Sequence, residues 1–171
     1  MEDKFTLSIL VNNEAGVLTR VSSLFGRRGY NIDSLSVGET EDPSLARMTI
    51  LSRGDIAIRD QIIKQLQKLV DVKVVQLMEP DNTVIRELML IKVNAELATR
   101  AQIHQVVDVF RAKVVDLSTT SMTIEITGEK TKLDAFVSNL IPYGILELCR
   151  TGITAIGRNS VILNNIESEE K

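Results

Sequence analysis

The sequence predicts an α+β protein built from two tandem domains, each with the element order strand, helix, strand, strand, helix, strand. Several short runs alternate apolar and polar residues, which is the period of a strand with one buried face. Longer runs repeat apolar residues at every third or fourth position, which is the period of an amphipathic helix. A segment of proline and turn-forming residues, 79–84, separates two such series and is expected to be a linker.

The first domain is expected to span residues 1–78. Its first helix is predicted from a core-facing stripe of Leu18, Val21, Leu24 and Phe25, and Gly29 ends it because glycine tolerates positive φ. Its second helix is predicted to begin after Asp55, which can act as a cap. Its strands are predicted at 5–11, 34–40, 45–53 and 70–77. This order is typical of the ferredoxin-like, or split βαβ, arrangement, with both helices on one face of a four-stranded antiparallel sheet.

The second domain, residues 85–160, is expected to repeat this order, and an acidic tail is expected at 161–171. Thr99 can cap its first helix, and Pro142 stops its second. Its strands are predicted at 87–93, 113–118, 121–127 and 145–150. The chain is therefore predicted to hold two ferredoxin-like βαββαβ domains in tandem.

In this topology the second and fourth strands lie at the edges of the sheet. An edge strand exposes a row of unpaired backbone N–H and C=O groups, which must be covered or paired. If strand 34–40 pairs with the same strand of a second copy about a two-fold axis, the edge groups of both copies form hydrogen bonds. We therefore expect a homodimer through this edge.

The composition excludes several classes of function. A net charge of -3 and a sequence pI near 5.3 argue against a general binder of nucleic acid or membrane surfaces. Aromatic residues make up 4% of the chain, with no Trp, which is too few for a base-stacking platform. The single cysteine fits a reducing compartment, and neither a secretory signal nor a membrane-length apolar run is visible. We expect a cytoplasmic protein.

The residues offer little chemistry of their own. The chain has one histidine and one cysteine, whereas a metal site needs several converging ligands, so we expect no metal site and no catalytic residue. His104 lies beside an apolar helical stripe and is expected to face solvent. Cys149 lies in an apolar strand and is expected to be a small core residue. The glycines at 26 and 29 match no phosphate-binding fingerprint.

The turn that follows the first strand, Asn12 to Arg20, is the candidate ligand site. The first N–H groups of a helix have no partner within the helix, so they can receive a carboxylate. In one interpretation Asn13 caps the helix and Gly16 only relieves crowding. In the other, Gly16 lets a ligand approach the backbone while an asparagine carbonyl accepts from a ligand ammonium. The local pattern leaves both interpretations open.

Five segments resemble the small, regulatory subunits of acetolactate synthase, also called acetohydroxyacid synthase. They are NEAGVLTRV at 13–21, LFGRRGYNIDSL at 24–35, DPSLARMTI at 42–50, LQKLVDV at 66–72 and RELMLIKV at 86–93. The resemblance spans nearly the whole chain. It implies that the first domain is an ACT domain, which binds an amino acid at a dimer interface.

The resemblance also implies a regulatory role in branched-chain amino acid biosynthesis. The implied partner is the large, catalytic subunit, a transferase that carries thiamine diphosphate and Mg and converts pyruvate to 2-acetolactate. The small subunit raises its activity and confers feedback inhibition by valine, or by leucine or isoleucine, without an active site of its own. The implied effector residues are Asn13, Gly16, Val17, Leu18 and Thr19 of one protomer with Asn31 and Ile32 of the other. The side chains of Val17, Leu18 and Ile32 are expected to form a small apolar slot.

Other functions stay open. A free-standing ACT protein could regulate another enzyme, a transporter or a transcription factor, and it would not copurify with a large catalytic subunit. A pair of RNA-binding ferredoxin-like domains is disfavoured, because strands 45–53 and 121–127 lack the aromatic residues that stack on bases. An independent enzyme has the least support.

Overall fold

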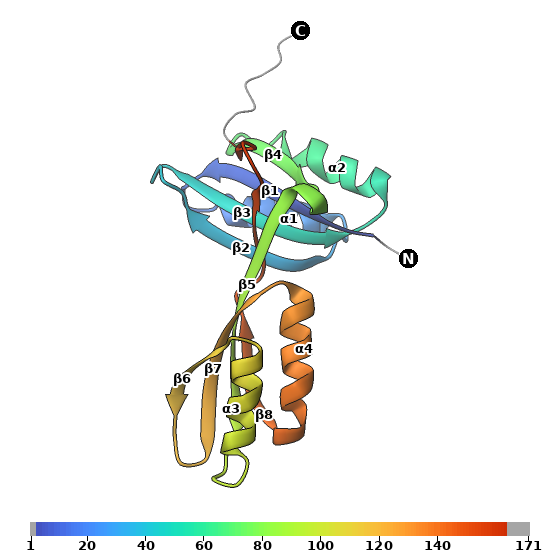
Figure 1. The fold of residues 1–171 in the computed structure, drawn as a ribbon. Helices are drawn as coiled ribbons and strands as arrows, with labels where there is room; N and C mark the ends of the chain where they lie inside the picture. The colour runs from blue at the N-terminus through green and yellow to red at the C-terminus, as the bar shows by residue number, and fades with distance from the viewer. Residues whose placement is uncertain (1–2, 164–171) are drawn as a thin grey trace. The chain divides into compact units, whose positions relative to one another are not determined.

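The computed structural model describes residues 3–163, which fold into two compact units (Figure 1). Within the described residues, the first unit comprises 3–84 and 153–163, and the second comprises 85–152. Each unit has the predicted strand–helix–strand–strand–helix–strand order. The α+β fold with two ferredoxin-like units is therefore confirmed.

The first unit is a four-stranded antiparallel sheet with two helices. Its elements are β1 (Lys4–Asn12), α1 (Val17–Arg27), β2 (Ile32–Glu39), β3 (Leu45–Arg53), α2 (Ile56–Leu66) and β4 (Val72–Met78). The strand order is β2-β3-β1-β4, so β2 and β4 are the edges, as the topology predicted. The register pairs Lys4 with Arg53 and Asn12 with Leu45. Because β1 and β2 are both antiparallel to β3, they run in the same direction.

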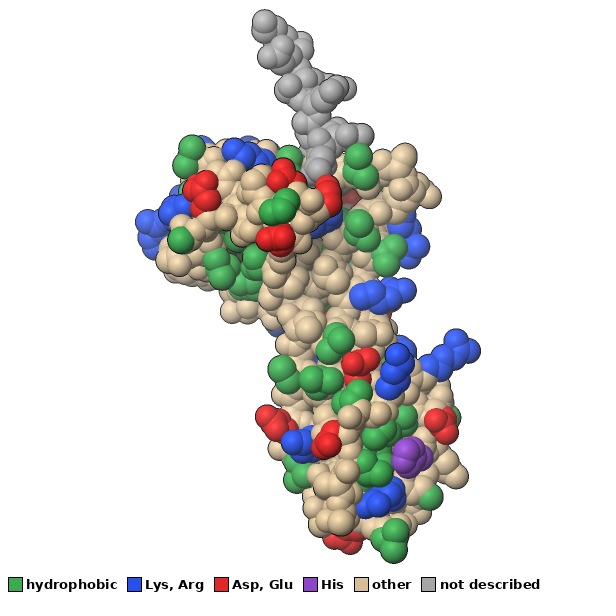
Figure 2. Space-filling model, turned by 90° about the vertical axis from the view of Figure 1, so that its left-hand side faces the viewer, with side chains coloured by type: hydrophobic (Ala, Val, Ile, Leu, Met, Phe, Trp, Pro, Cys, Tyr) green, Lys and Arg blue, Asp and Glu red, His purple; other side chains and the backbone are tan. Residues whose placement is uncertain are grey.

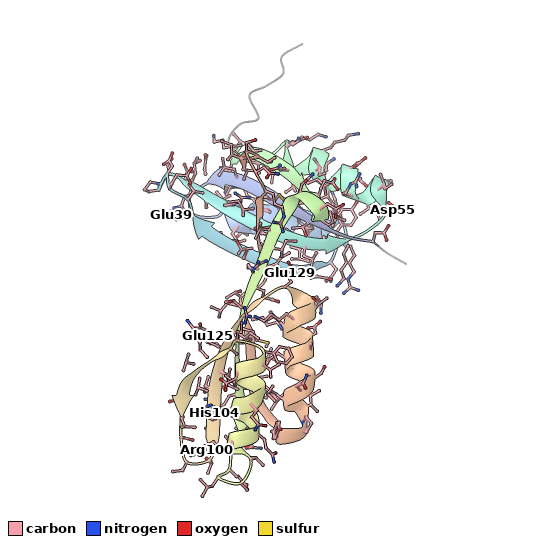
Figure 3. The ribbon with its side chains drawn as sticks, viewed as in Figure 1. Glu39, Asp55, Arg100, His104, Glu125 and Glu129 are labelled. Carbon is pink, nitrogen blue, oxygen red and sulfur yellow. The ribbon has the colours of Figure 1, made fainter. Side chains whose placement is uncertain are left out.

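The alternation in β1 explains how the helices are held. Its odd-numbered residues, from Phe5 to Val11, are at most 9% exposed and pack with the buried faces of both helices. Those helical side chains are Val17, Val21, Leu24, Phe25, Ile62 and Leu66. Burying each side chain of this size stabilises the fold by about 1.5–3 kcal/mol. The apolar face of β1 therefore determines on which side of the sheet the two helices pack. As predicted, Asp55 at the start of α2 (Figure 3) caps this helix by accepting from Ile58 N at 2.8 Å. Gly29 follows α1 at φ 70°.

The opposite face of this sheet is covered by the segment 153–163, which we call the C-terminal strap. Ile153 N donates to Ser34 Oγ at 2.8 Å, and Ser36 Oγ donates to Ile153 O at 2.6 Å. These contacts involve side chains on the sheet face, not the backbone edge of β2. Among the described residues, β2 pairs with β3 alone.

The strap corrects the expected domain boundaries. The sequence assigned residues 85–160 to the second domain, but the structure ends the second unit at Gly152. The physical reason is burial on the first sheet, where Ile153 is 7% and Ala155 is 4% exposed. Leu163 is also buried, although the tail was expected to begin at residue 161; residues 164–171 of that tail lie outside the described residues.

The expected linker, 79–84, contains a short 3-10 helix, η1 (Pro80–Asn82), and the first residues of β5. The elements of the second unit are β5 (Thr83–Asn94), α3 (Arg100–Val109), β6 (Lys113–Leu117), β7 (Ser121–Gly128), α4 (Lys130–Leu140), η2 (Ile141–Tyr143) and β8 (Ile145–Arg150). Its sheet has the order β6-β7-β5-β8, and β9 (Thr154–Gly157) also pairs with β5. The rings of Phe110 and Phe136 meet edge to face at 5.2 Å in its core.

Two details of the second unit differ from the prediction. Thr99 precedes α3, but its hydroxyl donates to Glu96 O at 3.2 Å and does not cap the helix. Cys149 is exposed and is not a core residue. It pairs with Leu90, which points away from the helices because its neighbours in β5 point toward them, and that face of the sheet is open.

Hydrophobic side chains also reach the surface (Figure 2). In the second unit the exposed ones include Val115, Leu117, Leu146 and Leu148, which lie on the edge strands β6 and β8. None of the helices in the described part of the chain is long and apolar enough to cross a membrane.

Arg47 fastens the strap to the first sheet. Its Nη2 donates to Ala155 O at 2.9 Å and its Nε donates to the fully buried Ser8 Oγ at 2.8 Å. Burial lowers the pKa of the Arg47 guanidinium, and the charge of Glu41 opposes this. The side chain therefore satisfies polar groups that the strap and sheet would otherwise bury without a partner.

We expect Arg47→Ala to lower the free energy of unfolding by about 1–3 kcal/mol, because it leaves buried acceptors unpaired. Urea unfolding of the full chain, with hydrogen exchange resolving the first unit, measures this change. The matched control is Arg28→Ala, which removes an exposed arginine after α1 and should change stability by about 0.5 kcal/mol or less. Equal midpoints for the two variants would contradict the role given to Arg47.

Candidate functional site

The turn between β1 and α1 brings a helix start to the surface without a side-chain cap. Gly16 occupies the N-cap position at φ 84° and the helix start has no side-chain cap hydrogen bond. Asn13, which one interpretation made the cap, is used differently: its Nδ2 donates to Pro43 O at 2.9 Å and to Glu39 Oε2 at 3.4 Å. The capping interpretation of Asn13 is therefore wrong. The backbone explains why, since Asn13 N donates to Ser44 O at 2.7 Å and ties the residue to the β2–β3 turn.

The first amides of α1 are available to an anion. Val17 N reaches Glu14 O at 3.4 Å, and within the described residues no backbone carbonyl outside the helix accepts from the amides of Leu18 or Thr19. Unpaired amides at a helix start carry partial positive charge and attract a carboxylate. Because the carbonyl oxygen of Asn13 lies opposite its donating NH2 group, it is left to accept from a cation.

The side chains of the turn divide between core and surface. Val17 is 2% exposed and belongs to the hydrophobic core, so it cannot line the apolar slot that the sequence predicted. The helical period explains this, because Val17 and Val21 share the buried stripe of α1. Leu18, which was predicted to belong to the core-facing stripe, is instead 44% exposed, and Thr19 is exposed. Val17 can serve a ligand only through its backbone.

Arg20, the last residue of the candidate turn, adds a positive charge to it, although Arg20 is not among the effector residues that the resemblance implied. Its Nε donates to Asp71 Oδ2 at 2.6 Å, and the Asp71 side chain is 9% exposed. Its Nη1 lies 3.1 Å from where a Cβ on Gly16 would be. The sequence spacing could have placed Arg20 beside Gly16, since a residue four positions further along a helix lies on the same face.

The other two predicted residues, Asn31 and Ile32, lie at the opposite end of the sheet. Ile32 pairs with Ser52, next to the pair formed by Lys4 and Arg53, at the start of β1. The turn that holds Gly16 follows the end of β1, and nine residues of strand separate the two ends by roughly 25 Å. The structure therefore gathers Asn13, Gly16, Leu18 and Thr19 at one place and Asn31 and Ile32 at another.

Asn31 is fixed by its own protomer. Ser52 Oγ donates to Asn31 O at 2.6 Å, and Asn31 Nδ2 donates to Asp33 Oδ1 at 2.7 Å. Asp33 also accepts from Arg53 Nε at 2.7 and 2.9 Å and pairs with Lys4 Nζ at 3.1 Å. The Arg53 hydrogen bonds hold the pKa of Asp33 below its ordinary value; burial opposes this, and Lys4 and Asn31 add to the lowering.

Other parts of the described chain were compared with this turn as places for a ligand or metal, and none that is named below has free polar groups that converge. No group of three or more His, Cys, Asp or Glu side chains that could hold a metal ion is found among the described residues. His104 lies partly exposed on α3 (Figure 3). A cavity of about 280 Å³ borders Arg47 and Leu163, but the Arg47 guanidinium is already bound to the sheet and the strap.

The comparisons with known proteins agree with this architecture. Residues 7–74 match the family described as "AHAS small subunit-like ACT domain", and residues 86–159 match "Small subunit of acetolactate synthase". The acetolactate synthase small subunit of Mycolicibacterium smegmatis is 52% identical over 153 residues, covering 90% of this chain and 90% of the relative. A probable acetolactate synthase small subunit of Methanothermobacter thermautotrophicus is 48% identical over 159 residues, covering 92% and 95%.

A solved structure gives the same picture. The crystal structure of the acetolactate synthase small subunit from Thermotoga maritima superposes with a TM-score of 0.87 at 42% identity, covering 93% of this chain and 99% of that one. The fold of the first unit and its family match define an ACT-domain protein. The identities extend over both units, and the chain belongs to the family of acetolactate synthase small subunits.

We expect the stability difference between the wild type and Asp33→Asn to depend on pH. The pKa of Asp33 is lower in the folded state than its ordinary value of 3.8, so the ionised group stabilises the fold fully above that value and progressively less below it. The difference should be constant from about pH 7 to about pH 4 and shrink below that. Hydrogen exchange of the β2 amides measures it. The exposed Asp81→Asn should show no such dependence, and a difference that persists at low pH would contradict the assignment.

Proposed function

We propose that this chain is the regulatory subunit of an acetolactate synthase, which binds the catalytic subunit, raises its activity and confers inhibition by valine. The observation that carries the proposal is the separation of the candidate site into two halves at opposite ends of one sheet. A site divided in this way is complete only when a second copy supplies the missing half. An effector that binds there acts on the assembly and not on one chain.

Strand direction supports this geometry. Asn13 contacts Glu39 at the end of β2, whereas Asn31 lies just before the start of β2. If the β2 edges of two copies pair antiparallel about a two-fold axis, the start of each β2 lies beside the end of the other. Asn31 and Ile32 of one copy then come next to Asn13 and Gly16 of the other. The edge is available for this, because the strap contacts β2 through the hydroxyls of its face.

The groups in this seam suit an α-amino acid. The Leu18 and Thr19 amides and the Arg20 guanidinium supply donors for the carboxylate. The carbonyl oxygens of Asn13 and Asn31 supply acceptors for the ammonium. Leu18, with Ile32 from the second copy, offers a small apolar surface for a branched side chain. Because one methylene changes the free energy of binding by only ~1–3 kcal/mol, we expect leucine and isoleucine to bind to the same site as valine.

The regulation follows from linkage. A ligand shared by two protomers stabilises the dimer geometry that holds it best, and coupling of ~1–3 kcal/mol changes a partner's activity by several-fold to about 100-fold. The catalytic subunit supplies the thiamine diphosphate and Mg on which the reaction of pyruvate depends. This chain supplies the effector site and no catalytic group.

The test uses the full chain with its catalytic subunit. Isothermal titration with valine, leucine and isoleucine, with and without the partner, measures effector binding, and enzyme assays measure activation and inhibition. We expect saturable valine binding at two ligands per dimer, because the two-fold axis creates one such site at each end of the seam. A chain that neither copurifies with a catalytic subunit nor changes its activity would instead be a free-standing ACT regulator.

We expect Gly16→Asp to abolish valine inhibition of the reconstituted enzyme. A carboxylate at this position competes with the ligand carboxylate for the α1 amides, and its Cβ meets Arg20 Nη1 at 3.1 Å. Gly16→Ala is the matched control, because it brings the same Cβ and the same strain at φ 84° without the charge. We expect it to weaken inhibition less, by about tenfold or below. Undiminished valine inhibition of Gly16→Asp would refute the proposed site.

A further inference from the structure

A β-bulge at the start of β2 turns Asp33 toward the sheet. The register pairs Ile32 with Ser52 and Ser34 with Leu51, so Asp33 is an extra residue with no partner of its own on β3. A bulge of this kind redirects a side chain that would otherwise follow the strand alternation. The result is a carboxylate only 8% exposed on an edge strand.

The buried carboxylate gathers donors from three directions. Arg53 Nε bonds both oxygens, Lys4 Nζ approaches one oxygen at 3.1 Å, and Asn31 Nδ2 donates to the other at 2.7 Å. The side chains of Arg53 and Lys4 are 47% and 42% exposed, so these two cations balance the charge of Asp33 from the solvent side. Asn31 is the one neutral donor, and it belongs to the proposed effector site.

The chemistry of this contact fixes the orientation of the Asn31 amide. An ionised carboxylate can only accept hydrogen bonds, so it favours the amide orientation that turns NH2 toward it and disfavours the flipped one. The backbone of Asn31 is held as well, because the fully buried Ser52 donates to its carbonyl at 2.6 Å. The side-chain oxygen of Asn31 is therefore the group that points away from the protomer's own contacts.

We infer that Asp33 is a positioning residue of the effector site, which holds Asn31 so that its carbonyl oxygen is presented to the effector ammonium. This inference rests on the proposed function. The opposite half of the site uses the same device, since Asn13 Nδ2 is held by Pro43 O and Glu39 Oε2, both of which only accept. Two carbonyls preset in this way accept from the ammonium without reorganisation, which is how a preorganised site gains affinity.

A double-mutant cycle tests the inference on the full chain. Isothermal titration with valine is performed on the wild type, Asn31→Ala, Asp33→Ala and the double variant. We expect each single substitution to raise the Kd for valine by about tenfold. Because Asp33 acts through Asn31, we expect the double variant to bind no more weakly than Asn31→Ala alone. A further tenfold loss in the double variant would show that Asp33 acts on the fold and overturn the inference.

Three further variants separate positioning from stability. Lys4→Ala removes another contact of the same carboxylate but keeps the Asn31 bond, so the Kd should stay within about twofold of the wild type. Asp33→Glu keeps a carboxylate and should recover part of the lost affinity. Asp33→Asn can donate as well as accept, so it permits the flipped amide and should remain weak. Equal losses for Lys4→Ala and Asp33→Ala would count against the inference.

The two proposals fail in different ways. If the wild type does not bind valine, the proposed effector site is wrong and the role of Asp33 falls with it. If the wild type binds valine and Gly16→Asp does not, while Asp33→Ala binds as well as the wild type, the site stands and only the positioning role is wrong.

Discussion

The common direction of β1 and β2 is the constraint on which the rest of the structure depends. Both strands pair antiparallel with β3, so the end of β1 and the start of β2 lie at opposite ends of the sheet. The helix start at Gly16 follows one end, and Asn31 precedes the other. No rotamer change or loop movement can bring residues together across the length of a strand. The topology itself therefore makes the proposed site depend on a second copy.

Carboxylates accept hydrogen bonds from three polar side chains of the two half-sites. Asp71 holds Arg20, Glu39 contacts Asn13 and Asp33 holds Asn31, at donor–acceptor distances of 2.6, 3.4 and 2.7 Å. Each acceptor uses one donor of its partner and leaves the remaining donors or the carbonyl facing outward. In the proposed site this leaves one guanidinium for the carboxylate of the effector and two carbonyl oxygens for its ammonium, although the chain as a whole carries a net charge of -3.

The sequence predicted what depends on periodicity and missed what depends on distant contacts. Alternation in β1 and the apolar stripes of the helices were enough for the fold, and the cap at Asp55 follows from local chemistry. The period alone did not fix every member of the stripe of α1, since the predicted stripe contained Leu18, which is 44% exposed, whereas Val17 is the buried residue. The exposure of Cys149 depends on which face of the second sheet stays open. The position of the strap, 153–163, depends on the face of the first sheet that the two helices leave uncovered. Neither is encoded in neighbouring residues.

The strap gives the edge strand a second connection. The chain leaves the first unit near Val84 and returns at Ile153, where the backbone is bound by the hydroxyls of Ser34 and Ser36. Ser34 directly follows Asp33, so the strap is anchored beside the bulge that holds Asn31. Any displacement of β2 therefore also moves the two hydroxyls that bind the backbone of Ile153. The bulge, the proposed effector residue Asn31 and the start of the strap thus form one contiguous set of contacts, and close-packed elements transmit a displacement to the groups that they contact.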